Sequence, residues 1–145
     1  MNENISIIIP IFNESSNIKQ IKKEIFYHLQ DFNFEIVFIN DASNDDSHIY
    51  LNNFSTLENI KILNNSKNLG QSKSLQKGII KSTYDTIVTI DGDCQNDPKD
   101  ILKLLKIYFS KDNINVTFVS GVRAKRKDNL IKIFSSKIAN KVRNF

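Results

Sequence analysis

Strand-like and helix-like patterns of apolar residues alternate along this chain. Continuous apolar runs rich in β-branched residues are typical of strands buried in a parallel sheet, and they occur at residues 5–11, 34–39, 60–63, 86–90 and 116–119. Apolar residues at helical spacing follow these runs, at residues 18–29, 49–54, 75–80, 101–105 and 129–142. This order predicts an α/β fold in which helices cover both faces of a mostly parallel sheet.

Polar residues that can carry chemistry follow the predicted strands directly. In open parallel sheets, ligands bind at the carboxyl ends of the strands. We therefore expect one site to gather the residues that follow four of these strands, namely Asn13, Glu14, Asp41, Asn68, Gly70, Asp91 and Asp93.

The sharpest local signal is Asp91-Gly92-Asp93, which follows a β-branched run. Glycine lets the backbone turn sharply, so both carboxylates can face one hard cation such as Mg²⁺ or Mn²⁺. Two acidic residues in a turn are more often solvated or capping groups. The position after a buried strand, before Gln95-Asn96-Asp97-Pro98, favours the metal interpretation here.

Composition excludes several classes of protein. A single cysteine, Cys94, excludes a disulfide framework and, with two histidines, a Cys/His zinc site, and it indicates a reducing, cytoplasmic setting. Four dispersed glycines form neither a dinucleotide fingerprint nor a P-loop. No apolar run approaches the roughly 18 residues of a membrane span, so we expect no transmembrane segment.

Positive charge is concentrated in residues 121–145. The whole chain has a net charge of +4, whereas this segment alone carries +7. Such a segment suits phosphates, an anionic membrane surface or nucleic acid, and a solvated helix face is the simpler alternative. Nucleic acid is disfavoured because interleaved aromatic residues and a recognition motif are lacking.

Five runs, in this order, resemble the motifs of the inverting family 2 glycosyltransferases: residues 7–14 (IIIPIFNE), 38–47 (FINDASNDDS), 68–79 (NLGQSKSLQKGI), 89–101 (TIDGDCQNDPKDI) and 121–140 (GVRAKRKDNLIKIFSSKIAN). They are most similar to the bacterial branch related to dolichyl-phosphate mannosyltransferase and other polyprenyl-phosphate sugar transferases. The resemblance covers nearly the whole chain and implies a Rossmann-like GT-A fold. Haloacid-dehalogenase-like phosphatases also use Asp-x-Asp, but after the first strand rather than the fourth.

The resemblance also implies roles for individual residues. Asp41 would recognise the base, with Asp45 or Asp46 nearby, and Asp91 and Asp93 would bind the metal, with Asp93 as the more direct ligand. Gln95 would approach the sugar and the acceptor phosphate. The remaining nucleotide contacts and the phosphate-facing pair would be Pro10, Asn13, Glu14, Asn68, Gly70, Arg123 and Arg126.

The implied activity is metal-dependent transfer of a sugar from a UDP- or GDP-sugar to a polyprenyl or dolichyl phosphate, in cell-envelope glycan or glycolipid biosynthesis. The metal and the cationic side chains would stabilise the departing diphosphate. A phosphate acceptor is already anionic and needs no strong base, whereas a hydroxyl acceptor would require one. The basic segment predicts peripheral contact with the inner face of the membrane.

The chain departs from the family pattern in sequence and in length. Ala42 stands where glycine is common, and Ser74 stands where a small apolar residue is usual. Family members continue past residue 145 into an acceptor segment, so we expect one catalytic domain over residues 1–145 that holds the donor-binding part. The alternative is a non-catalytic nucleotide-sugar-binding fragment, or half of a split transferase that needs a partner chain or a second copy.

Overall fold

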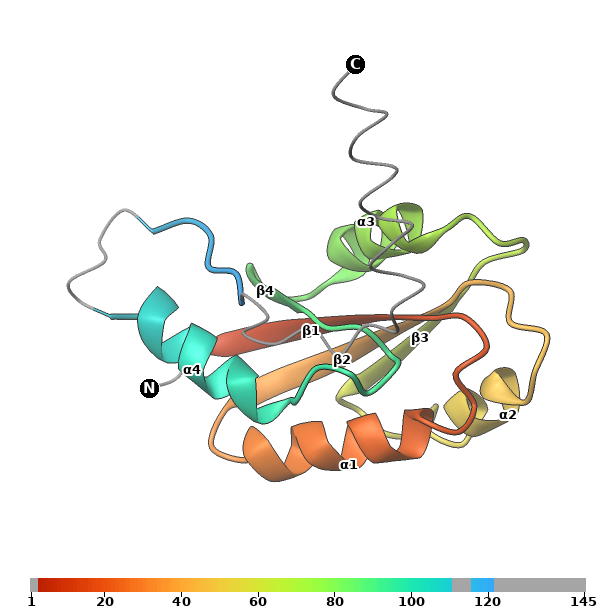
Figure 1. The fold of residues 1–145 in the computed structure, drawn as a ribbon, viewed down its shortest axis with the longest axis horizontal. Coiled ribbons are helices and arrows are strands. Elements are labelled where there is room, and N and C mark those ends of the chain that lie inside the picture. The colour runs from red at the N-terminus through yellow and green to blue at the C-terminus, as the bar shows by residue number, and fades with distance from the viewer. Residues whose placement is uncertain (1–2, 111–115, 122–145) are drawn as a thin grey trace, which may run out of the picture.

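The computed structural model describes residues 3–110 and 116–121. Strands and helices alternate strictly along the described chain (Figure 1). The strands are β1 (Asn4–Ile11), β2 (Asn33–Asn40), β3 (Ile60–Asn64) and β4 (Thr86–Thr89). The helices are α1 (Ile18–His28), α2 (Ser47–Asn52), α3 (Gln71–Lys81) and α4 (Lys99–Tyr108).

The described strands form one parallel sheet in the order β3-β2-β1-β4. The two central strands, β1 and β2, are paired along their whole length, from Asn4 with Asn33 to Ile11 with Asn40. Each crossover between parallel strands contains a helix, as such connections require. All strands therefore end at the same edge of the sheet, which is the edge where the predicted site residues follow them.

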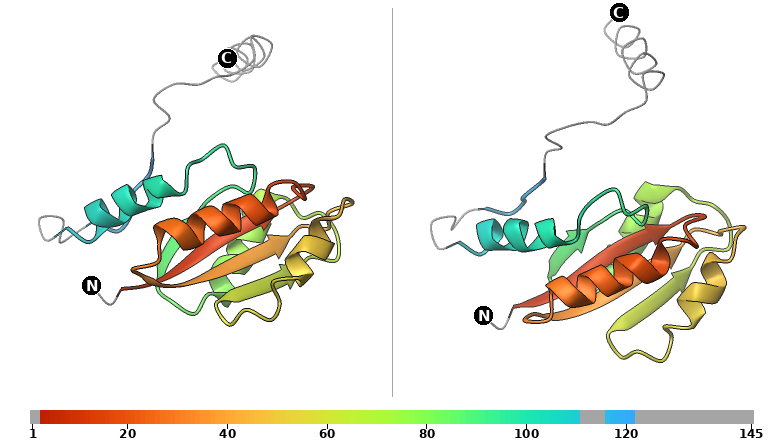
Figure 2. Two further views of the ribbon diagram at one scale, coloured as in Figure 1. Left: turned by 90° about the horizontal axis from the view of Figure 1, so that it is seen from below. Right: turned by 60° about the horizontal axis from the view of Figure 1, so that its bottom comes forward.

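Helices cover both faces of the sheet, but unequally (Figure 2). Helices α1, α2 and α4 lie on one face, where Ile5, Ile7, Ile9 and Ile11 of β1 enter the larger core. Of the described helices, α3 is the one on the other face, where it packs on the smaller cluster of Ile8, Val37 and Ile39. The side chains of each strand alternate between the two faces, so one apolar run supplies both cores.

Helix α3 lies very close to the sheet. A Cβ atom added at Gly78 would lie 2.4 Å from Ile8 Cγ2, which is too close. Any residue larger than glycine at this position would therefore require its neighbours to shift. The buried positions of α3 are Ser74 and Gly78, whereas two of the apolar positions that mark the helix in the sequence, Ile79 and Ile80, are 46% and 70% exposed. Close packing demands small residues on the inner face, and the hydrophobic pattern does not reveal them.

The predicted strand at residues 116–119 is wrong. This run has no strand pairing in the structure, and its Phe118 is 79% exposed. A buried parallel strand needs a hydrogen-bonded neighbour and cover on both faces, and the described part of the chain provides neither here. The predicted basic helix at residues 129–142 lies outside the described residues. Among the described helices, none is long and apolar enough to cross a membrane.

Candidate functional site

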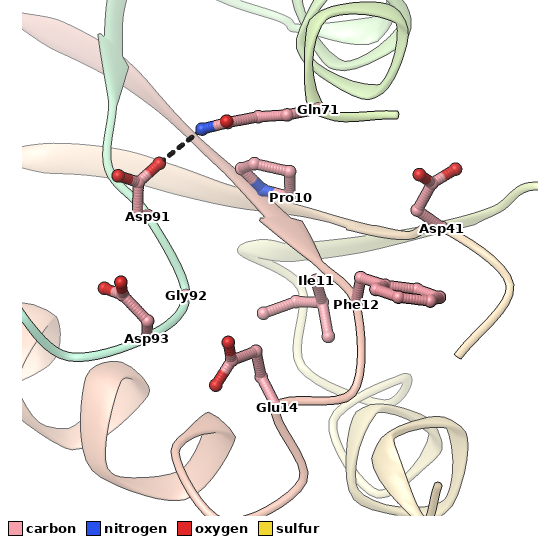
Figure 3. Close-up of a pocket in the computed structure, with 9 residues that line it drawn as sticks. All are labelled: Pro10, Ile11, Phe12, Glu14, Asp41, Gln71, Asp91, Gly92 and Asp93. Carbon is pink, nitrogen blue, oxygen red and sulfur yellow. Dashed lines mark hydrogen bonds between the residues drawn. The ribbon is translucent and has the colours of Figure 1, made fainter. Parts of the chain in front are cut away.

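A cavity of about 260 Å³ opens at the carboxyl ends of β1, β2 and β4 (Figure 3). Its walls come from the end of β1 and the turn after it, from the residue after β2, from the start of α3 and from the turn after β4. The lining residues are Pro10, Ile11, Phe12, Glu14, Asp41, Gln71, Asp91, Gly92 and Asp93. The expectation that polar residues from different strand ends meet at one edge is confirmed for Glu14, Asp41, Asp91 and Asp93.

The Asp91-Gly92-Asp93 turn lies directly against β1. A Cβ atom at Gly92 would stand 2.5 Å from Ile11 Cδ1 and 3.1 Å from the Pro10 carbonyl oxygen. Glycine is therefore needed here for close approach of two backbones. This approach carries both carboxylates to the cavity wall, as Figure 3 shows.

The two carboxylates are held by amide groups. Asp91 Oδ1 accepts a hydrogen bond of 2.6 Å from Gln71 Nε2, and Asp91 Oδ2 accepts one of 3.5 Å from Asn96 Nδ2. Asp93 Oδ1 accepts the backbone N–H of Gln95 at 3.0 Å. Within the described residues, neither carboxylate forms an ion pair with a lysine or arginine. Their negative charge therefore remains available to a bound cation.

The donor set fits a hard divalent cation that shares its coordination with a ligand. Among the described residues, no cluster of three or more His, Cys, Asp or Glu side chains is close enough to hold a metal by itself. Two aspartates can supply oxygen ligands, and Mg²⁺ is commonly bound by one or two carboxylates together with substrate phosphates. The arrangement suits an ion that is completed by a diphosphate.

Asp41 is 3% exposed, yet it forms part of the cavity wall. Its Oδ1 accepts hydrogen bonds from Asn65 Nδ2 at 2.7 Å and from the Leu69 amide at 2.9 Å, and its Oδ2 accepts the Gly70 amide at 2.8 Å. Burial opposes ionisation of this carboxyl, but the hydrogen bonds outweigh it and hold its pKa below the usual value. Asp41 thus carries a negative charge that anchors the turn before α3.

Asp45 and Asp46 do not line the cavity. The Asp45 carboxylate accepts the backbone N–H groups of Ser15 and Ser47, each at 3.0 Å. Burial raises the pKa of Asp45, but hydrogen bonds with Ser47 and Ser15 lower it by more, so that the pKa falls to about 2. Asp45 therefore ties the turn after β1 to the start of α2, while Asp46 is exposed at that helix end.

Asn13 joins two neighbouring turns and is not among the residues that line the cavity. Its φ is 57°, its amide donates to Ser43 Oγ at 3.1 Å, and its Oδ1 accepts the Asn44 amide at 2.8 Å. The next residue, Glu14, lines the cavity, and its carboxylate accepts Asn17 Nδ2 at 2.6 Å. Asn13 thus shapes the turn that presents Glu14.

The remaining predicted residues lie at the margin of the cavity or outside the described chain. Asn68 and Gln95 are exposed and do not line the cavity. Gly70 has a φ of 86° and immediately precedes α3. Its backbone amide donates to Asp41, which lines the cavity. Arg123 and Arg126 lie outside the described residues.

Cys94 provides no nucleophile. It is half-buried, and burial, with the nearby charges of Asp93 and Glu14, raises the pKa of its thiol. A raised pKa leaves little reactive thiolate at neutral pH.

The lining residues that the sequence did not single out include Phe12 and Gln71. Phe12 continues an apolar run and looks like part of the strand, but the residue is 44% exposed and lines the cavity. Gln71 looks like an ordinary first residue of a helix, and its bond with Asp91 links α3 to the turn after β4. Neither contact has a signature in the sequence, because both depend on how separate strand ends meet.

Comparison with known families gives one broad match. A family model described as glycosyl transferase family 2 matches residues 6–144. The undecaprenyl-phosphate 4-deoxy-4-formamido-L-arabinose transferase of Pseudomonas syringae pv. syringae (strain B728a) is 30% identical over 140 residues. That alignment covers 94% of this chain and 40% of the relative, so the chain spans well under half of the relative's length.

Solved structures resemble the chain in fold. The mannosyltransferase PcManGT from Pyrobaculum calidifontis, in complex with GDP-Man and Mn²⁺, matches with a TM-score of 0.59 and 18% identity, over 70% of this chain and 31% of that one. Residues 1–349 of S. aureus TarS in complex with UDP-GlcNAc match with a TM-score of 0.62 and 20% identity, over 88% and 39%. These likenesses confirm the predicted GT-A type of α/β fold.

Proposed function

The chain belongs to glycosyl transferase family 2, and from this premise we propose that it binds a nucleoside diphosphate sugar at the carboxyl end of its sheet and takes part in transfer of the sugar. The observation that carries the proposal is the cavity itself. Its lining includes Asp91 and Asp93, which have no cationic partner in the described chain. It also includes the exposed Phe12 and the buried Asp41.

Asp91 and Asp93 are the proposed ligands of Mg²⁺ or Mn²⁺, with Asp93 as the more direct one. Gln71 already donates to one oxygen of Asp91, whereas within the described residues Asp93 accepts a hydrogen bond from a backbone amide of its own turn alone. When bound, the ion would offset the negative charge that develops on the departing diphosphate. The Mn²⁺ in the PcManGT complex supports the proposal of a divalent cation.

The nucleoside is proposed to lie between Phe12 and Asp41. An exposed aromatic ring offers a face on which a base can stack, and Asp41, which lines the cavity, offers carboxylate oxygens as acceptors for a base N–H. The turns that hold Pro10, Asn13 and Glu14 on one side and Asn68 and Gly70 on the other would enclose the nucleotide. Both a uridine and a guanosine donor remain open, and the structural neighbours named above bind UDP-GlcNAc or GDP-Man.

A polyprenyl phosphate is the proposed acceptor. The support is the Pseudomonas relative, whose name specifies undecaprenyl phosphate. Such an acceptor is already an oxyanion, so the reaction needs orientation and charge neutralisation more than a general base. Gln95, Arg123 and Arg126 are proposed to face the phosphates, and the basic segment 121–145 to contact the cytoplasmic face of the membrane in cell-envelope biosynthesis.

A second candidate function is donor binding without transfer. The alignment with the Pseudomonas relative covers 40% of that protein, and in this alternative the chain binds the donor and acts with a partner chain or a second copy. This alternative predicts nucleotide binding with no sugar transfer to undecaprenyl phosphate. Transfer by the purified chain alone would overturn it.

The test is calorimetric titration of UDP and GDP into the chain, with and without Mn²⁺. We expect one nucleotide to bind in a metal-dependent way, and Asp93→Ala to weaken that binding by at least about tenfold, because a direct charged ligand is lost. Asp31→Ala is the matched control, since Asp31 is exposed on the loop between α1 and β2. Unchanged affinity in Asp93→Ala would contradict the metal assignment.

A further inference from the structure

A second group of polar side chains lies behind Asp41, outside the cavity. Asn65 is 7% exposed and Ser74 is completely buried. Asn65 Nδ2 donates to Asp41 Oδ1 at 2.7 Å and to Ser74 Oγ at 3.1 Å, and its Oδ1 accepts Lys77 Nζ at 2.7 Å. None of these three residues lines the cavity, and the proposed function gives none of them a role.

Lys77 determines which way the Asn65 amide faces. An ammonium group can only donate hydrogen bonds, so the amide oxygen must face Lys77. The amide nitrogen is thereby turned toward Asp41, whose ionised carboxylate can only accept. Lys77 Nζ also donates to the Asn64 carbonyl oxygen at 2.7 Å, which holds the lysine at the end of β3 by a second contact.

The hydrogen bonds continue from Asp41 into the cavity. Asp41 accepts the amides of Leu69 and Gly70, which form the turn before α3. Gln71, the first residue of α3, donates to Asp91 across the cavity (Figure 3). A connected series of contacts therefore runs from Lys77 of α3, through Asn65 and Asp41, to the turn that precedes Gln71.

We infer that Lys77 and Asn65 are positioning residues, which hold Asp41 and the Leu69–Gly70 turn in the geometry that binds the nucleoside of the donor without touching it. The inference rests on the proposed function. The inference also explains why position 74 is polar. The Ser74 hydroxyl accepts the second amide hydrogen of Asn65, whereas a small apolar residue there would leave that hydrogen without a partner.

Loss of Lys77 would act on binding more than on folding. Lys77 is half-buried, and methionine keeps most of its aliphatic stem. Without the ammonium, the Asn65 amide would still donate to Asp41 and Ser74, but its oxygen would lose the charged donor that holds it. Asp41 and its turn would then be held less rigidly, while the packing of α3 on the sheet would remain.

The experiment compares Lys77→Met with Lys73→Met, a change of the same kind at an exposed position one turn earlier in α3. The ligands are UDP and GDP with Mn²⁺, and pyrophosphate with Mn²⁺ as a probe that lacks the nucleoside. Affinities are measured by calorimetry, and melting temperatures are measured on the same samples. A purely structural role of Lys77 would lower the melting temperature and affect both kinds of ligand alike.

We expect Lys77→Met to weaken the nucleoside diphosphate by about tenfold, the size of one charge-assisted hydrogen bond, and to leave pyrophosphate binding and Lys73→Met unchanged. In an Asn65→Leu background, Lys77→Met should have no further effect, because Lys77 acts through Asn65. Unchanged nucleotide affinity in Lys77→Met, or equal loss for pyrophosphate, would overturn the inference. Failure of the unmodified chain to bind UDP or GDP would instead overturn the proposed function on which it rests.

Discussion

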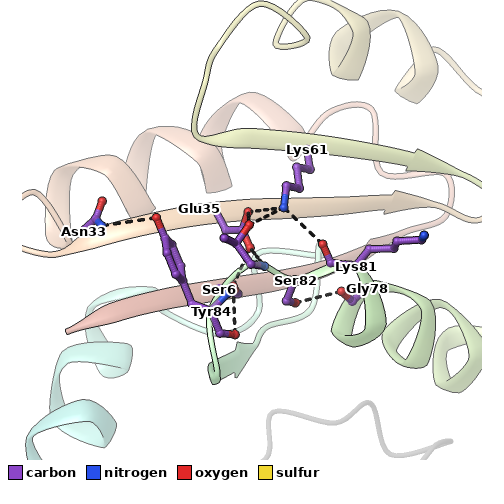
Figure 4. Close-up of polar contacts among 9 residues, drawn as sticks. Ser6, Asn33, Glu35, Lys61, Gly78, Lys81, Ser82 and Tyr84 are labelled. Atoms are coloured by element: carbon purple, nitrogen blue, oxygen red, sulfur yellow. Dashed lines mark hydrogen bonds and ion pairs between the residues drawn. The ribbon is translucent and has the colours of Figure 1, made fainter.

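Within the described residues, each end of the sheet holds a buried carboxylate, and the two carboxylates have different hydrogen-bond partners. Asp41, after β2, is 3% exposed, and Glu35, near the start of the same strand, is 5% exposed. Both have a lowered pKa. Asp41 is stabilised by the side chains of Asn65 and Ser74 and by the backbone amides of Leu69 and Gly70, which belong to one turn. Glu35 is stabilised by hydroxyl groups, a backbone amide and a lysine (Figure 4).

The partners of Glu35 come from several elements. Ser6 Oγ of β1 donates at 2.6 Å, Thr83 before β4 donates through its amide and its hydroxyl, and Lys61 Nζ of β3 lies 2.9 Å away. These contacts join the amino-terminal parts of β1, β2 and β3 to the segment that leads into β4. The Glu35 cluster works as a structural tie, whereas Asp41 fixes one turn and faces a cavity.

Backbone strain follows the same division. Among the described residues, the non-glycine positions with positive φ are Asn13, Ala42 and Cys94, and all three lie in turns at the carboxyl ends of strands. Strain of this kind persists where the surroundings impose it, and it gathers at functional sites. The contacts at the amino end of the sheet thus stabilise the fold. The strained turns at the carboxyl end cost some stability and shape the site.

The largest expected effect is at the amino end. Glu35→Ala should lower the free energy of unfolding by about 3 kcal/mol, because it leaves Ser6, the Thr83 amide and Lys61 without their acceptor. Nucleotide affinity should not change. Urea unfolding and UDP or GDP titration measure the two quantities, with Glu58→Ala at an exposed position as the control. A loss of affinity in a folded Glu35→Ala sample would refute the division between the two ends.

A smaller effect is expected from Asp45, between the turn after β1 and α2. Its folded pKa of about 2 lies below its ordinary value of 3.8, so its stabilisation is present above that value and is lost as pH falls toward 2. The shift corresponds to about 2 kcal/mol. Asp45→Asn should cost about this much at pH 7 and almost nothing near pH 2. Urea unfolding between pH 2 and pH 7 tests this, and a loss independent of pH would contradict it.

The smallest expected effect comes from Ala42. Its φ of 57° lies in the left-handed region, which costs an alanine about 1–2 kcal/mol, while glycine loses more chain entropy on folding, by roughly 0.5–1 kcal/mol. Ala42→Gly should therefore stabilise the chain by about 0.5–1 kcal/mol, and Ala42→Val should destabilise it. Denaturant midpoints of both variants provide the check. A stabilised Ala42→Val would show that this turn is not strained.

The alternation of strand and helix patterns was sufficient to predict the fold class and four of the strands. Apolar runs and helical spacing are local properties, and parallel strands joined by helices leave few alternatives. The same logic placed Glu14, Asp41, Asp91 and Asp93 at one edge, because residues that directly follow parallel strands must meet there. The run at residues 116–119 shows the limit, since an apolar run becomes a strand only when a neighbour pairs with it.

The sequence by itself determined the order of elements, the edge where chemistry gathers and the family motifs. Tertiary structure decided which polar groups meet within that edge. Phe12 is exposed, Asp45 links the turn after β1 to the start of α2, and Lys77 reaches Asp41 through Asn65, although the two residues lie 36 positions apart in the chain. Hydrogen bonds between separate loops depend on distances of a few tenths of an ångström, and no local pattern of residues specifies such distances.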